Sequence, residues 1–114
     1  MYFGLIGLIA GSAIAQARKG RTMITPTIGR VVWVIRPYDA MDPKQPEVGL
    51  VTYVHSDRCI NVVGFNCVGD RFALASLALV QDDDPKPPGN FACWMPYQKG
   101  QAAKAEALEA AAKA

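Results

Sequence analysis

Residues 48–65 constrain the fold more than any other stretch of the chain. They read VGLVTYVHSDRCINVVGF, two runs rich in branched and aromatic side chains that are separated only by Ser56, Asp57 and Arg58. Branched and aromatic residues fit a pleated sheet, while Ser and Asp favour a tight reversal, so the stretch predicts a β-hairpin. A single hairpin is marginally stable in water, and further strands must therefore cover it.

Three other segments have the composition of strands: 28–35, 71–80 and 91–95. Together with the hairpin they predict five strands, enough for a small barrel. Alternation is blurred in 71–80, where a helical turn over 75–79 is the alternative. One face of that strand would carry Phe72, Leu74, Ser76, Ala78 and Val80. The aromatic residues expected in the barrel core are Trp33, Tyr53, Phe65, Phe72 and Trp94.

The two ends of the chain differ in composition from this central part. Residues 1–17 carry no charge and precede a basic cluster at 18–21, and residues 98–114 are rich in Ala, the strongest helix former. The sequence therefore predicts three parts: an apolar helix with a basic flank (1–22), a β domain (23–97) and an Ala-rich helical tail (98–114).

Three interpretations of the apolar segment 1–17 stay open. As a helix it would be about 25 Å long, a little short of the roughly 30 Å hydrocarbon core of a bilayer, and the basic flank would keep the β domain cytoplasmic. Gly7, Gly11 and Ala15 recur at a spacing that lets apolar helices pack closely, in a homo-oligomer or a larger particle. The end of the segment, AQA, also resembles a signal-peptide cleavage box, although no basic residue precedes it.

Charge argues against a nucleic-acid partner. The whole chain has a net charge of +2, but residues 23–97 carry six basic and eight acidic side chains, a net charge of −2. A phosphate-binding surface needs clustered Lys and Arg, which this part lacks.

Groups that could support catalysis or bind a metal are sparse. His55 lies near Cys59 across the hairpin turn, but no oxyanion-hole glycines follow, so a structural role is favoured over nucleophilic catalysis. The three cysteines, Cys59, Cys67 and Cys93, include no Cys-x-x-Cys pair and predict buried, reduced thiols. The carboxylates at 82–84 lack the Gly and Glu of a calcium loop and predict a solvated charge run. We expect no enzymatic activity, no cofactor and no metal.

The proline-rich loop 36–47 (RPYDAMDPKQPE) is the favoured binding site. Its three prolines cannot continue a strand ladder, and loops on a rigid scaffold often carry binding residues. The predicted contact residues for a protein partner or a small ligand are Trp33, Tyr38, Met41 and Trp94. A solvated connector is the alternative interpretation.

Three motifs resemble those of small uncharacterised proteins of tailed bacteriophages and prophages. They are PTIGRVV at 26–32, SDRCINV at 56–62 and WMPYQKGQ at 94–101, and they resemble a family pattern with a T-x-G-R-[IV]-V strand and a Trp-x-Pro motif. The resemblance covers about residues 24–104 and implies a phage origin and a compact SH3-like barrel. It carries over no catalytic residue, and the segment before Met23 departs from it.

The sequence thus predicts a mainly β protein: a small SH3-like five-stranded barrel with an N-terminal apolar helix and a C-terminal Ala-rich helix. The favoured function is a phage-encoded, non-enzymatic binding module for a host or phage protein or a small ligand. It would act in the host cytoplasm, with anchoring in the inner membrane or association with the virion as open alternatives. The alternative function is a structural virion or membrane-associated assembly protein held together by Gly7, Gly11 and Ala15.

Overall fold

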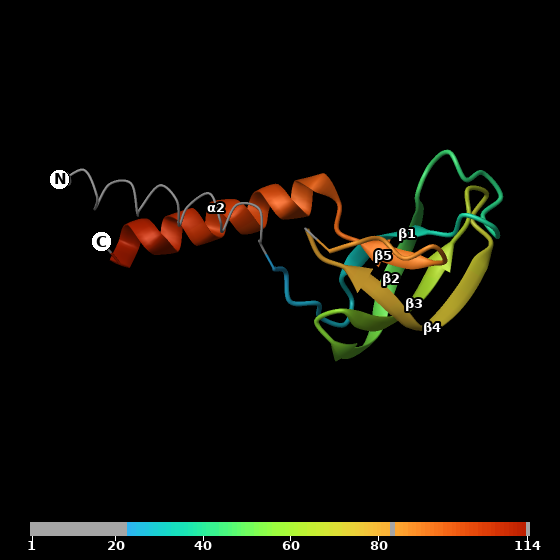
Figure 1. Ribbon diagram of the computed structural model, residues 1–114, viewed down its shortest axis with the longest axis horizontal. Coiled ribbons are helices and arrows are strands. Elements are labelled where there is room, and N and C mark those ends of the chain that lie inside the picture. Colours follow the sequence, from blue (N-terminus) through green and yellow to red (C-terminus); the bar gives the residue numbers. More distant parts are fainter. Residues whose placement is uncertain (1–22, 83, 114) are drawn as a thin grey trace.

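The five predicted strands are present, and a helix follows them (Figure 1). The computed structural model describes residues 23–82 and 84–113. Its elements are β1 (Val31–Ile35), β2 (Glu47–Ser56), β3 (Cys59–Phe65), β4 (Arg71–Val80), β5 (Phe91–Cys93) and α2 (Pro96–Lys113). The prediction of a mainly β fold with a C-terminal helix is confirmed. The predicted apolar helix, with Gly7, Gly11 and Ala15, lies outside the described residues.

The strands close into a barrel in the order β1-β2-β3-β4-β5. The predicted hairpin forms β2 and β3, with Ser56 opposite Cys59 and the amide of Arg58 donating to Ser56 Oγ at 3.2 Å. β1 pairs antiparallel with both β2 and β5, whereas β4 and β5 run parallel. The short β5 therefore closes the sheet between β1 and β4.

Ten residues form the continuous core inside this barrel: Ile24, Val32, Val34, Val51, Ile60, Val62, Leu77, Leu79, Ala92 and Trp94. Alternate residues of β1 and β2 point inward, as the two-residue period of a strand requires. Of the aromatic residues expected there, Trp94 is the one fully buried, at 2% exposure. The prediction was wrong for Trp33, which is half-buried on the outer side of β1, and for Tyr53 and Phe65, which are exposed.

Two glycines let the barrel wall approach its core closely. Gly49 and Gly64 face each other across β2 and β3 and are both buried. A Cβ atom at Gly49 would lie 2.6 Å from Val34 Cγ2, and one at Gly64 would overlap the ring of Phe72. Both positions therefore exclude larger side chains, because overpacking a core displaces its neighbours.

A β-bulge in β4 explains the blurred alternation of its sequence. Two residues of β4, Ala75 and Ser76, lie opposite the single residue Asn61 of β3. Ser76 has a φ of 52°, and its amide donates to Asn61 Oδ1 at 2.7 Å. An extra residue reverses which side chains face inward, so Phe72 and Leu74 point inward before the bulge and Leu77 and Leu79 after it. The single face predicted for this strand was wrong, as was the alternative of a helical turn.

The helix α2 begins at the barrel and leads away from it (Figure 1). Proline suits its first position, because the missing N–H has no partner there in any helix. Gln98 caps the start by accepting the amide of Met95 at 2.9 Å, and it donates to the carbonyl of Val31 at 2.7 Å. Leu108 is exposed, as expected for a helix with little to bury. Across residues 23–82 and 84–113, no helix is both long and apolar enough to cross a membrane.

Candidate functional site: a cleft beside the proline-rich loop

A buried ion pair holds the two ends of the proline-rich loop together. Arg36 follows β1 and Glu47 opens β2, and their side chains form two hydrogen bonds, Nε to Oε1 at 2.6 Å and Nη2 to Oε2 at 3.1 Å. The side chains are 13% and 4% exposed. The Arg36 guanidinium also lies 3.9 Å from the centre of the Phe72 ring. The hydrogen bond to Glu47 raises the pKa of Arg36, so the guanidinium keeps its charge.

A cleft of about 320 Å³ opens between this loop and the turn that joins β3 to β4. We call it the loop cleft; its lining residues are Asp42, Gln45, Pro46, Glu47, Val48, Phe65, Asn66 and Cys67. Val48 and Phe65 are direct neighbours across β2 and β3 and form an apolar floor. Figure 1 shows the loop and the turn together at the end of the barrel far from α2, so the helix does not cover them.

Short contacts fix both walls of the loop cleft. The amide of Lys44 donates to Asp42 Oδ1 at 3.0 Å, and Asn66 Oδ1 accepts the amides of Val68 and Asp70 at 3.1 and 2.8 Å. These side-chain bonds to the backbone shape tight turns. Across the cleft mouth, Cys67 Sγ lies 3.4 Å from Met41 Sδ.

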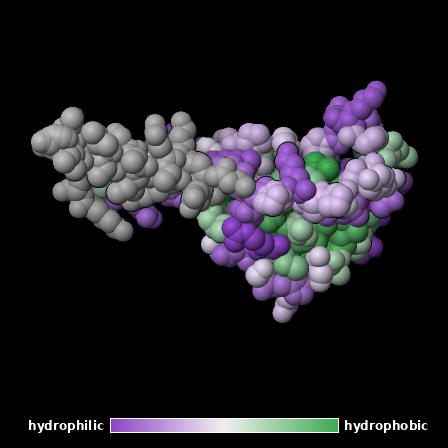
Figure 2. All heavy atoms as spheres, viewed as in Figure 1, coloured by the Kyte–Doolittle hydropathy of each residue, from purple (hydrophilic) through white to green (hydrophobic). Residues whose placement is uncertain are grey.

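The floor of the cleft continues into an apolar surface on the outside of the barrel. Val48 lies beside Trp33 of β1, and Leu50 lies between Val31 and Val63. Residues directly opposite in a sheet point to the same side, and the alternate residues of these strands face the core. We call this surface the outer apolar face; its members are Val31, Trp33, Val48, Leu50, Val63 and Phe65. Figure 2 shows one side of the barrel, on which apolar side chains lie among polar ones.

The four predicted contact residues lie in different parts of the structure. Tyr38 and Met41, on the loop, are 83% and 61% exposed, and Trp33 is half-buried on the outer apolar face. Trp94 instead lies in the core, where its indole N–H donates to Gln81 Oε1 at 3.1 Å. It is therefore not available for contact with a partner, and we leave it out of the candidate site.

Gln81 is a buried polar residue that sequence reasoning missed. Its position next to the acidic run at 82–84 gives no sign of burial, but it is 4% exposed and its side-chain amide forms four hydrogen bonds within the barrel. Oε1 accepts from the Ile24 amide at 3.2 Å and from Trp94, while Nε2 donates to the carbonyls of Ile24 and Asp57 at 3.0 and 2.8 Å. The residue thereby joins the segment before β1, the hairpin turn and the residue that follows β5.

His55 is held by a neighbour rather than paired with a thiol. Its Nε2 lies 2.9 Å from Asn61 Oδ1, the same oxygen that accepts the Ser76 amide. That oxygen is an acceptor, so Nε2 carries the proton. The Tyr53 ring packs edge-on against the imidazole, with 4.8 Å between ring centres. No hydrogen bond joins His55 to Cys59 in the part of the chain described.

Asp82 and Asp84 of the acidic run are paired with cations of the same chain. Asp84 binds Arg58 Nε at 2.8 Å, and Asp82 binds Lys99 Nζ at 3.2 Å. Residue 83 lies outside the described residues. Among those that are described, no three His, Cys, Asp or Glu side chains gather closely enough to hold a metal ion.

The pairing of Asp84 predicts a loss of stability in acid. Hydrogen bonds from Arg58 and from the Gln81 amide lower the pKa of Asp84 below its unfolded value. A carboxyl whose pKa is lower in the folded state stabilises the fold above its unfolded pKa, and the contribution disappears as the pH falls through the folded pKa. The thermal unfolding midpoint should therefore drop as the pH falls below about 4. We expect a shallower drop in Asp84→Asn and in Arg58→Ala; wild-type slopes in both would contradict the assignment.

The three cysteines are free thiols in the structure. Cys59 and Cys93 are half-buried, and burial raises the pKa of Cys93. Cys67 is exposed at the mouth of the loop cleft, so the expectation of buried thiols was wrong there.

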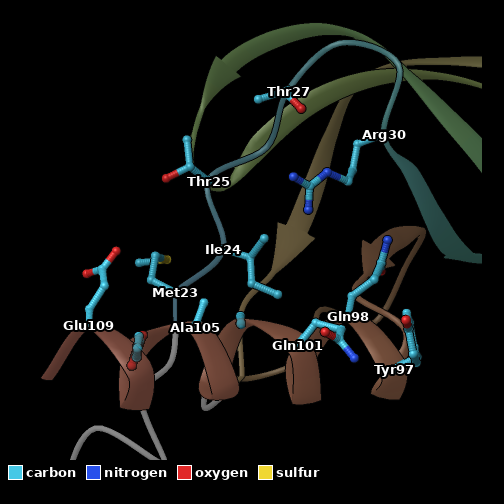
Figure 3. Close-up of a pocket in the computed structure, with 12 residues that line it drawn as sticks. Met23, Ile24, Thr25, Thr27, Arg30, Tyr97, Gln98, Gln101, Ala105 and Glu109 are labelled. Carbon is cyan, nitrogen blue, oxygen red and sulfur yellow. The ribbon is translucent and has the colours of Figure 1, made fainter. Parts of the chain in front are cut away.

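A second groove of about 810 Å³ lies between α2 and the segment before β1. Figure 3 shows Met23 and Ile24 on one side and Gln101, Ala105 and Glu109 of α2 on the other. The chain before Met23 lies outside the described residues, so this groove defines no site by itself.

No protein-family model matches the chain, and no curated protein or solved structure is significantly similar to it.

Proposed function

We propose that this protein is a non-enzymatic binding module of SH3-like architecture, encoded by a tailed bacteriophage or prophage. Its partner is a host or phage protein, with a small ligand as the alternative, and it acts in the host cytoplasm. The observation that carries the proposal is the outer apolar face, which continues into the floor of the loop cleft through Val48 and Phe65. Tyr38 and Met41 are exposed on the loop that forms one wall of this cleft.

The composition of this surface suits a protein interface. Contiguous exposed apolar patches mark interaction sites, and aromatic residues and Met are enriched in them. The patch extends over three neighbouring strands. This extent favours a protein partner over a small ligand, which binds mainly inside a concave pocket.

The loop is also preorganised for binding. The Arg36–Glu47 pair fixes both ends, and the Asp42–Lys44 bond shapes its middle. A loop that is already ordered loses less conformational entropy on association. His55 does not lie in this surface, since it is bound to Asn61 on the far part of the hairpin.

An affinity experiment with two matched variants tests the proposal. The purified chain is immobilised, proteins captured from host lysate are identified, and each is purified and titrated against the chain. We expect the double variant Tyr38→Ala, Met41→Ala to bind a true partner with an affinity tenfold or more below that of the wild type. Truncating an interface anchor typically costs more than about 1 kcal/mol of binding free energy. Unchanged affinity in that variant would remove the proposed surface.

Tyr97→Ala provides the control. Tyr97 is equally exposed but lies on α2, far from the loop, so its truncation should leave partner affinity unchanged. Circular dichroism during urea unfolding must show that all variants are as folded as the wild type.

A further inference from the structure

The loop cleft has an unbalanced negative charge beside an apolar floor. Two of its eight lining residues are acidic, and none is basic. The charge of Glu47 is neutralised by Arg36, which binds both of its oxygens. Asp42 remains, and it forms no ion pair with any residue of the described chain.

Asp42 is also held in position. Its Oδ1 accepts the backbone amide of Lys44 at 3.0 Å, which fixes the carboxylate at the cleft wall. Lys44 itself is exposed, and its ammonium makes no ion pair with Asp42 in the described part of the chain. A fixed carboxylate beside an apolar surface loses little freedom when it binds a cation.

The side chains that match such a site are Lys and Arg. Their methylene stems cover apolar surface while their charged ends stay in contact with water or a carboxylate. The stem would lie on Val48 and Phe65, and the cation would meet Asp42. A volume of about 320 Å³ is at the small end of ligand pockets, which suits one side chain better than a large cofactor.

We propose that the loop cleft binds a Lys or Arg side chain of the partner protein, next to an apolar residue that lies on the outer apolar face. This inference rests on the proposed function, because the cleft and that face share Val48 and Phe65. It adds the chemical class of the segment that is recognised: a basic residue flanked by an apolar one.

Capped peptides in which one residue changes test the inference. The probes are acetyl-Gly-Leu-Xaa-Leu-Gly-amide with Lys, norleucine or Glu at Xaa, titrated into the ¹⁵N-labelled full chain and followed by NMR. The Lys peptide should shift the amide signals of Asp42, Val48 and Phe65. Norleucine keeps the apolar stem without the charge, so its affinity should be about two- to fivefold lower, as expected for an exposed ion pair. The Glu peptide should bind more weakly still.

Asp42→Asn is the matched variant, because asparagine keeps the Oδ1 acceptor for Lys44 but removes the charge. It should reduce the affinity of the Lys peptide by about two- to fivefold and leave the norleucine peptide unchanged. Asp70→Asn, in the neighbouring turn but outside the cleft lining, is the control and should have no effect.

Equal affinity for the Lys and norleucine peptides, no effect of Asp42→Asn, signal shifts elsewhere on the barrel, or no binding would each overturn the inference. None of these results bears on the affinity test of the Tyr38→Ala, Met41→Ala double variant. The broader proposal fails separately, if a purified partner binds that variant as tightly as it binds the wild type.

Discussion

Gln81→Leu is expected to lower the free energy of unfolding by about 3 kcal/mol or more. The substitution removes all four hydrogen bonds of the buried amide and leaves the Trp94 indole, both backbone groups of Ile24 and the Asp57 carbonyl without partners. Each buried polar group that loses its partner costs about 1–3 kcal/mol. Urea denaturation followed by tryptophan fluorescence measures the change.

Two comparisons isolate the cause of this loss. Gln101→Leu makes the same replacement at an exposed position of α2 and should change stability by less than about 0.5 kcal/mol. Trp94→Phe removes one of the orphaned donors, so it should cost less in the Gln81→Leu background than in the wild type. A small loss of unfolding free energy in Gln81→Leu would show that the side-chain amide does not hold the segments around it together. The same would follow if the effects of Gln81→Leu and Trp94→Phe on the unfolding free energy were strictly additive.

Glu47→Ala should have the second large effect, a loss of about 3–5 kcal/mol. Removing one partner leaves the Arg36 guanidinium buried without its counter-charge, and this is the costly way to break a buried ion pair. The released loop should also exchange its amide hydrogens faster over residues 37–46. Denaturant unfolding and hydrogen exchange measure the two effects.

The same pair allows a sharper test of mechanism. Replacing both partners, as Arg36→Met with Glu47→Leu, should recover most of the stability, because no charge is left unpaired. Arg58→Ala, which breaks the exposed Arg58–Asp84 pair, should cost much less than Glu47→Ala. Similar losses of unfolding free energy for Glu47→Ala and Arg58→Ala would mean that the burial of the Arg36–Glu47 pair does not make it more costly to break than an exposed pair.

Local sequence patterns were sufficient to predict most of the barrel. The hairpin was predicted because β-prone runs flank a short polar turn, and the bounds of β4 were predicted as they are observed. The sequence did not predict which residues of β4 face inward, because the bulge at Ser76 depends on the Asn61 side chain of the neighbouring strand. Tyr53 and Phe65 were misplaced for a related reason. Aromatic character does not show which side of a strand faces the core.

The candidate site was only partly predictable. Proline content identified the loop, and Tyr38 and Met41 are exposed on it as a contact role requires. The loop cleft itself depends on contacts between residues far apart in the sequence, such as Met41 with Cys67, 26 positions apart, and Val48 with Phe65, 17 apart. Gln81 has no local signature at all, because its importance comes from three segments that meet only in the folded barrel.

The strand pairing restricts the ways in which the outer apolar face can recognise another chain. At this face β2 and β3 each have a paired strand on both sides, so an extended peptide cannot join the sheet there as an additional strand. Affinity at this face must then come from the partner's side chains rather than its backbone. Methylating the backbone nitrogens of a peptide bound there should therefore be tolerated, whereas scrambling its sequence should abolish binding.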